Sequence, residues 1–106
     1  SGTVWQDEGY AVEWIDSRGR MMVYRKLPDG AAIGRIGPPV TAVASDSRYL
    51  SARVTSAGPG GDAYYYLDKS MDSDLKNGSE IAVGPLTKAA FDAVRATLNI
   101  PEPVPF

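Results

Sequence analysis

The chain contains no histidine and no cysteine in 106 residues. Histidine is the usual general base near neutral pH, and histidine and cysteine together supply most protein ligands for transition metals. Cysteine also supplies the thiolate nucleophile of many enzymes. Their absence excludes the common transition-metal sites and most catalytic mechanisms. We therefore expect a protein that is not an enzyme, with no catalytic residues, no metal site and no cofactor.

Long hydrophobic runs and clusters of basic residues are also missing. The 11 basic and 13 acidic residues are scattered along the chain and give a net charge of −2. Without a basic patch the chain lacks the electrostatic footprint that nucleic acid requires. No apolar run approaches the roughly 18 residues that would predict a membrane span. The length is typical of one core, so we expect residues 1–106 to form a single domain.

Short segments in which aromatic and β-branched residues alternate with polar ones are separated by Gly, Pro, Asp and Ser. This pattern is typical of antiparallel strands joined by turns. On the strand at 49–55, the alternation predicts that Leu50 and Ala52 face the core and that Ser51 and Arg53 face outward. We expect strands or short apolar strand-like segments at residues 10–15, 21–26, 31–36, 40–44, 49–55, 63–67 and 81–83.

One segment near the end has a helical period. Phe91, Val94 and Leu98 are spaced to form one apolar face, and Thr87 is a good N-cap. Asn99 can adopt the left-handed conformation that ends a helix. We expect a helix over residues 88–98, and an α+β fold in which an antiparallel β-meander of about six strands carries this one C-terminal helix packed on the sheet. Residues 1–8 form an N-terminal segment, and the Pro-rich tail at 101–106 either packs along the body or is loose.

Two further segments show no recognised catalytic pattern. Asp68, Asp72 and Asp74 lack the glycine and glutamate spacing of a calcium-binding loop, so we expect them in a solvated loop between strands. The glycine-rich segment at 56–62 has no following Lys-Ser or Lys-Thr and no helix start, which excludes a phosphate-binding loop. We expect an exposed, mobile loop there. The Asn77–Gly78 dipeptide is typical of a tight turn.

Tyrosines in the expected sheet are the strongest candidates for a binding surface. Only half of the side chains on an alternating strand can face the core, and exposed Tyr beside Arg is typical of protein-binding hot spots. An alternative is that the tyrosines lie at the edge of the core with their hydroxyls in water. The candidate binding residues are Tyr64, Tyr66, Arg53, Pro59, Gly60 and Asp62.

The segments Tyr64–Lys69, Gly84–Thr87 and Leu98–Pro101, together with Phe91, resemble a pattern of small bacterial lipoproteins. In those chains a Tyr-rich strand leads to a Gly-Pro-Leu start of a final helix. The resemblance implies export, a lipid anchor on a Cys upstream of this sequence, and no known enzymatic role. Ser1–Gly2 lacks an initiator Met, which is typical of a cleavage scar or of a processed terminus. The expected location is periplasmic or membrane-anchored by lipid, with the cytoplasm as the alternative.

These observations favour a non-catalytic exported bacterial binding protein. Its most specific form is an immunity or inhibitor protein that binds a partner toxin or enzyme, and an acidic chain would suit a basic partner. The alternative is a structural or assembly component of a cell envelope or phage particle, in which the Pro-rich tail and sheet edges make contacts by strand addition. An enzyme that uses Asp, Glu or Tyr alone is the least favoured hypothesis.

Overall fold

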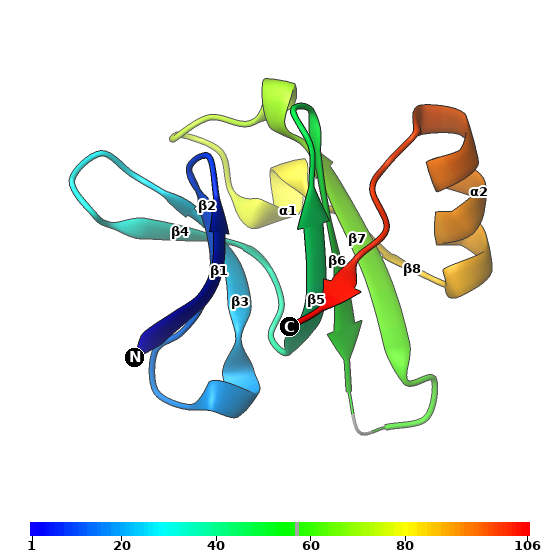
Figure 1. Cartoon of the computed structure of the whole chain (residues 1–106), viewed down its shortest axis with the longest axis horizontal. Helices are drawn as coiled ribbons and strands as arrows, with labels where there is room; N and C mark the ends of the chain where they lie inside the picture. The colour runs from blue at the N-terminus through cyan, green and yellow to red at the C-terminus, as the bar shows by residue number, and fades with distance from the viewer. Residues whose placement is uncertain (57) are drawn as a thin grey trace.

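The computed structural model describes residues 1–56 and 58–106 and has an α+β fold (Figure 1). Its strands in chain order are β1 (Gly2–Asp7), β2 (Tyr10–Trp14), β3 (Met22–Lys26), β4 (Ala32–Ile36), β5 (Val40–Ser45), β6 (Tyr49–Thr55), β7 (Asp62–Asp68), β8 (Val83–Leu86) and β9 (Val104–Pro105). The α-helices are α1 (Gly78–Ile81) and α2 (Lys88–Leu98), and the short 3₁₀-helices are η1 (Arg18–Arg20) and η2 (Lys69–Met71).

The strands form two antiparallel sheets. Sheet A has the order β1-β2-β3-β4, and sheet B has the order β8-β7-β6-β5-β9. Each sheet therefore contains a meander of neighbouring strands, and the expected α+β class with one main helix is confirmed. The division falls between β4 and β5, where Gly37, Pro38 and Pro39 interrupt the chain. Proline has no backbone N–H to donate to a ladder, so one strand cannot continue through this segment.

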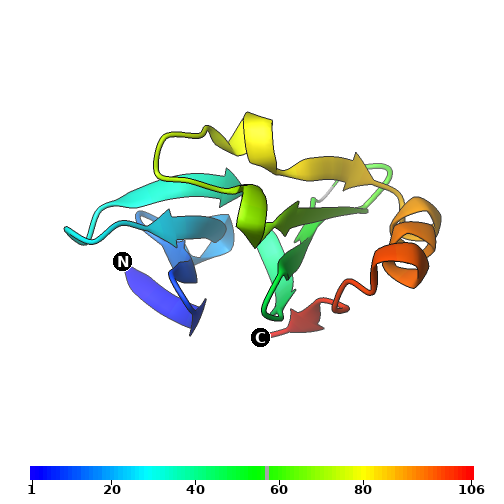
Figure 2. The same ribbon diagram turned by 90° about the horizontal axis from the view of Figure 1, so that it is seen from above.

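The main core lies between the two sheets. Val12 and Val23 of sheet A and Leu50 and Leu67 of sheet B belong to one fully buried apolar cluster. Helix α2 lies on the other side of sheet B, so the molecule has three layers (Figure 2). Tyr64 and Phe91 stack with ring centroids 5.1 Å apart and belong to a second cluster, which lies between α2 and sheet B.

Helix α2 agrees with the sequence prediction at both ends. The Thr87 hydroxyl accepts a hydrogen bond from the backbone N–H of Ala90, which satisfies one of the free donors of the first turn. Asn99 has φ 59° and ends the helix in the left-handed conformation. Phe91 is fully buried in the centre of the apolar face.

Strand β6 differs from the expected inward and outward alternation. Tyr49, Leu50, Ser51 and Ala52 are all buried, because sheet A covers one face of the strand while α2 and the C-terminal tail cover the other. The Ser51 hydroxyl donates to the carbonyl oxygen of Pro101 in that tail. Burial of this polar group is therefore compensated by a hydrogen bond.

The side chain of Asp72 is also buried, which corrects the expectation that this residue lies in a solvated loop. Its side chain and that of Arg35 are both 0 % exposed, and they form a bidentate ion pair with distances of 3.0 Å and 2.9 Å. Tyr10 donates its hydroxyl to the same carboxylate at 2.7 Å, and Arg25 joins Tyr10 to Asp74. This network of hydrogen bonds and ion pairs links the β7–α1 connection to β2, β3 and β4 of sheet A.

Two local predictions in the same part of the chain are wrong. Asn77–Gly78 begins helix α1 instead of forming a hairpin turn, and the Asn77 N–H donates to the Glu80 carboxylate at 2.9 Å. Ile81 ends this helix with its side chain in the core, so the strand that follows β7 is β8 at Val83–Leu86 and not residues 81–83.

Both terminal segments belong to the sheets. The segment at residues 1–8 contains β1, one of the two edge strands of sheet A. In the tail, Val104 and Pro105 pair with Val43 and Ala42 of β5, so the tail packs along the body. No helix in the described part of the chain is long and apolar enough to cross a membrane.

Candidate functional site

The predicted binding residues share one region of sheet B but do not form one surface. Arg53 lies opposite Tyr64 in the β6–β7 ladder, so both project from the sheet face that α2 covers. Tyr66 follows two positions later on that face. Asp62 begins β7 at the other end of the strand, where its carboxylate accepts a hydrogen bond from Thr55.

Helix α2 covers part of this face of sheet B. Tyr64 is only 8 % exposed because Phe91 stacks on its ring, so it lies in the core beneath α2 and offers little surface to a partner. Its role in binding stays a prediction. Arg53 is half-buried and donates to the Thr41 hydroxyl at 3.0 Å. Pro59 and Gly60 are exposed in the β6–β7 loop. Position 57 of that loop lies outside the described residues.

Tyr66 remains partly open and lies in a groove of about 380 Å³, which we call the Tyr66 groove. The groove lies between η2, α1, β8 and the C-terminal end of α2, beside the β6–β7 ladder. Its apolar lining includes three exposed side chains: Met71 is 60 % exposed, Val83 is 42 % exposed and Leu98 is 39 % exposed. Tyr49 meets Tyr66 edge to face at 6.3 Å and supports the base of the groove. Concave apolar surface of this kind is typical of binding sites.

Charged residues of both signs surround the Tyr66 groove. Arg48 and Asp68 form an ion pair at 3.0 Å, and the remaining charged lining residues are Lys76 and Glu80. Hydrogen bonds from Ser70, and then from Arg48, hold the pKa of the Asp68 carboxyl below its ordinary value. The two signs balance, so the rim does not select a strongly charged ligand.

The buried ion pair helps to fix one wall of the groove. Met71 directly precedes Asp72, which Arg35 and Tyr10 hold in the interior. Burial, followed by hydrogen bonding to Asp72, raises the pKa of Tyr10 to about 12. The protonated hydroxyl donates to the Asp72 carboxylate. The Lys76 ammonium donates to the Met71 carbonyl oxygen at 2.6 Å and closes the same loop. Met71 is therefore exposed on a segment with an anchored backbone.

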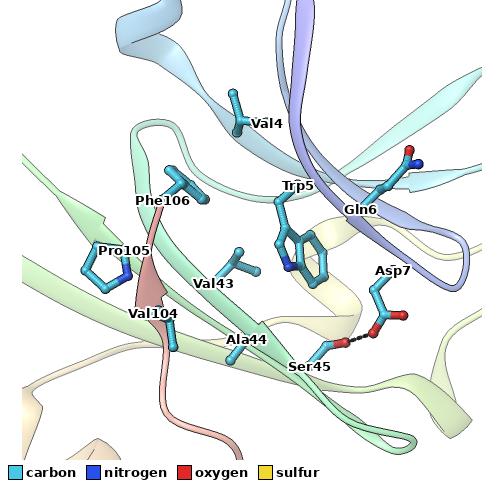
Figure 3. Close-up of a pocket in the computed structure, with 10 residues that line it drawn as sticks. All are labelled: Val4, Trp5, Gln6, Asp7, Val43, Ala44, Ser45, Val104, Pro105 and Phe106. Carbon is cyan, nitrogen blue, oxygen red and sulfur yellow. Dashed lines mark hydrogen bonds between the residues drawn. The ribbon is translucent and has the colours of Figure 1, made fainter.

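A second concavity lies between the two sheets and is called the Trp5 groove here (Figure 3). Its volume is about 580 Å³, and its walls come from β1, from β5 and from the C-terminal segment. The Trp5 side chain extends from β1 toward Val43 and Ala44 of β5. At one end the Ser45 hydroxyl donates to the Asp7 carboxylate and joins the two sheets.

Sequence reasoning missed most of the Tyr66 groove. Leu98 was expected in the helix stripe, but its position beyond the buried Phe91 leaves it at the edge of the covered surface. Met71 is an isolated apolar residue in a polar segment, and that is a signal of exposure in the sequence. Val83 carried no such signal, because its exposure depends on where β8 lies at the edge of sheet B.

Ionisable side chains in the described part of the chain show no metal-binding arrangement: no group of three or more acidic residues there could hold a metal ion. The buried carboxylate of Asp72 is fully engaged by Arg35 and Tyr10 and faces neither groove. Comparison with protein-family models, with curated proteins and with solved structures finds no match to this chain.

Proposed function

We propose that this chain is a non-catalytic protein-binding domain and that its docking surface is the Tyr66 groove. The observation that carries the proposal is the convergence of exposed Met71, Val83 and Leu98 on a partly open tyrosine in one concave surface. Aromatic residues, Met and Arg are enriched at the centres of protein interfaces. Met can also adapt its shape to a partner side chain.

The lining favours an apolar side chain of a protein partner as the occupant. The Arg48–Asp68 pair neutralises its own charges at the rim, whereas the interior offers aromatic and aliphatic surface. Burying one large apolar side chain in such a pocket contributes on the order of 2 kcal/mol. The paired charges at the rim would exclude water from around the partner's apolar side chain, as the residues that encircle an interface hot spot do.

The specific form we propose is an immunity or inhibitor protein that binds a toxin or an enzyme. Small size and the lack of histidine and cysteine support a role in binding, and the net charge of −2 suits a basic partner. In this proposal the protein is exported and is periplasmic or lipid-anchored. A cytoplasmic protein with the same groove is the alternative for its location.

A structural or assembly role in a cell envelope or phage particle is the second candidate function. It is favoured by the free edge of β1, which offers backbone groups for contact with another chain. The Pro-rich tail adds less to this candidate than the sequence indicated, because its residues already pair with β5. Self-association that increases with concentration would favour this role.

The test compares affinity capture by the wild-type protein with capture by Val83→Arg and Ile15→Arg variants. Ile15 is a matched control, because it is an apolar residue that is 60 % exposed and directly follows β2, outside the Tyr66 groove. We expect one stoichiometric partner from the native organism to bind the wild type and Ile15→Arg but to be lost with Val83→Arg. Equal capture by all three proteins would contradict the assignment of this groove.

Capture is followed by measurement of the purified pair. We expect Val83→Arg to weaken the complex by about 2 kcal/mol or more, on the order of 30-fold in Kd, as loss of a hot-spot contact does. Circular dichroism confirms that each variant is folded. A captured enzyme whose turnover falls on binding would support the inhibitor form, and an envelope component that binds without this loss would favour the second candidate.

A further inference from the structure

The four sheet edges in the described part of the chain differ in their capacity to accept another strand. Strand β8 contains Pro85, and β9 is two residues long and ends in Pro105. Neither proline can donate a backbone hydrogen bond. Helix α1 lies against β4, so closely that a Cβ atom on Gly78 would approach the Gly34 carbonyl oxygen to 2.9 Å. Strand β1 has no proline and no covering helix.

The pairing of β1 with β2 identifies which backbone groups are free. Glu8 and Gly9 form a two-residue turn with φ of 42° and 87°, as the tight hairpin turns require. The closing pair Asp7–Tyr10 is then hydrogen-bonded, and the next pair, Gln6–Ala11, is not. The Gln6 N–H and C=O groups therefore point to the open edge. Within the described residues no backbone bond outside the sheet ladders reaches them.

The bulge between Thr3 and Trp5 limits how long an added strand can pair regularly. Regular pairing is confined to the stretch from Trp5 to Asp7, which borders the Trp5 groove (Figure 3). Because side chains alternate along a strand, those of Trp5 and Asp7 lie on the face toward sheet B. In an added strand, the neighbours of the residue opposite Gln6 would point to that same face and into the groove.

Charge at the end of the hairpin restricts the partner further. Asp7 and Glu8 are adjacent acidic residues, and the Asp7 side chain is 40 % exposed. Lys69 lies 3.9 Å from Asp7 and offsets part of its charge. Lys26, which is near the same turn, is already bound to Glu13 at 3.0 Å. An additional cation beside Glu8 would complement this acidic end.

We propose that the open edge of β1 binds an extended segment of another protein by strand addition. The segment pairs with the Gln6 backbone, places an apolar side chain in the Trp5 groove and places a Lys or Arg side chain beside Glu8. In strand addition the backbone provides affinity, while pockets for alternate side chains provide specificity. This surface is separate from the Tyr66 groove, so the two assignments succeed or fail independently.

The first experiment titrates the isotopically labelled protein with a synthetic peptide of alternating Thr and Val that has Lys at both ends. We expect a dissociation constant below about 1 mM, with amide shifts concentrated at Gln6 and its neighbours. A peptide with the same side chains and N-methylated internal amides cannot donate to β1, and we expect it not to bind. No binding by the first peptide, or equal binding by the N-methylated peptide, would overturn the proposal.

Two substitutions of one residue separate backbone from side-chain effects. Gln6→Pro removes the outward N–H without removing a bond to β2, and we expect it to weaken peptide binding at least about tenfold. Gln6→Ala keeps the N–H and should bind like the wild type. If Gln6→Pro does not fold, the comparison with the N-methylated peptide still tests whether binding requires backbone hydrogen bonds to β1. Dimerisation of the wild type that Gln6→Pro abolishes would overturn the assigned occupant in favour of a second copy of the chain.

Discussion

At the scale of single residues, Asp72 has the largest expected effect on stability. Replacing it with Asn leaves the Arg35 guanidinium buried at 0 % exposure without its counter-charge. We expect Asp72→Asn to lower the free energy of unfolding by about 3–5 kcal/mol, because an uncompensated buried charge is strongly destabilising. Asp74→Asn is the control, since Asp74 is 48 % exposed and pairs with Arg25 at the surface. Its expected cost is below about 1 kcal/mol. Denaturant unfolding measures both, and equal costs would contradict the role of the buried pair.

The same carboxylate makes stability depend on acid. Burial alone would raise the pKa of Asp72, but hydrogen bonds from Arg35 and Tyr10, with the Arg35 charge, outweigh it and lower the pKa below its ordinary value of 3.8. A lowered folded-state pKa gives stability that is present above 3.8 and is lost as the pH falls through the lower folded value. We expect the unfolding free energy of the wild type to fall more steeply in this acid range than that of Asp72→Asn. Parallel curves for the two proteins would refute this linkage.

At the scale of elements, the N-cap of α2 provides a sharp comparison. Thr87→Ala removes the acceptor of the Ala90 N–H and should cost about 1 kcal/mol of unfolding free energy. Thr97→Ala, in the last turn of the same helix, removes a hydroxyl that bonds back to the Ala93 carbonyl oxygen. We expect that change to be neutral or slightly stabilising, because alanine has the higher helix propensity. Thermal unfolding of both variants checks the prediction, and a similar loss at both positions would argue against a specific cap effect.

The contrast between α2 and β6 shows which elements can be predicted from local sequence. The start, the end and the buried stripe of α2 follow from Thr87, Asn99 and Phe91, whose effects act within a few residues. The burial of Ser51 depends on Pro101, which is 50 positions away. The alternation of side chains predicts which residues share a face of the strand. It does not predict whether another part of the chain will pack on the second face. The same limit explains why Tyr64, beneath α2, was expected at the surface.

At the scale of the whole molecule, the α+β class could be predicted because turn residues and periodicity mark most of the strands. The separation into two sheets was not predicted, although Gly37, Pro38 and Pro39 mark the break between β4 and β5. A break in the chain does not show whether the next strand returns to the same sheet, because that depends on contacts between residues far apart in the sequence. The Arg35–Asp72 pair joins positions 37 apart, and the loop of Asp72 then determines where Met71 lies. The Tyr66 groove is lined by residues of six elements, β6, β7, η2, α1, β8 and α2, which contacts between distant positions bring together. Of its lining, only Tyr66 was among the binding residues chosen from the sequence.

The burial of both faces of β6 has a consequence for the exchange of backbone hydrogens with solvent. Strands β5 and β7 also flank β6 on both sides, so the amides of residues 50–52 are shielded in every direction. We expect them to exchange with deuterium only when the entire chain unfolds, so that their protection equals the global free energy of unfolding. The Gln6 amide, on the free edge of β1, should exchange orders of magnitude faster while the protein remains folded. Exchange read by NMR would then rank the layers of the molecule by the order in which they open, with β6 as the last to lose its protection.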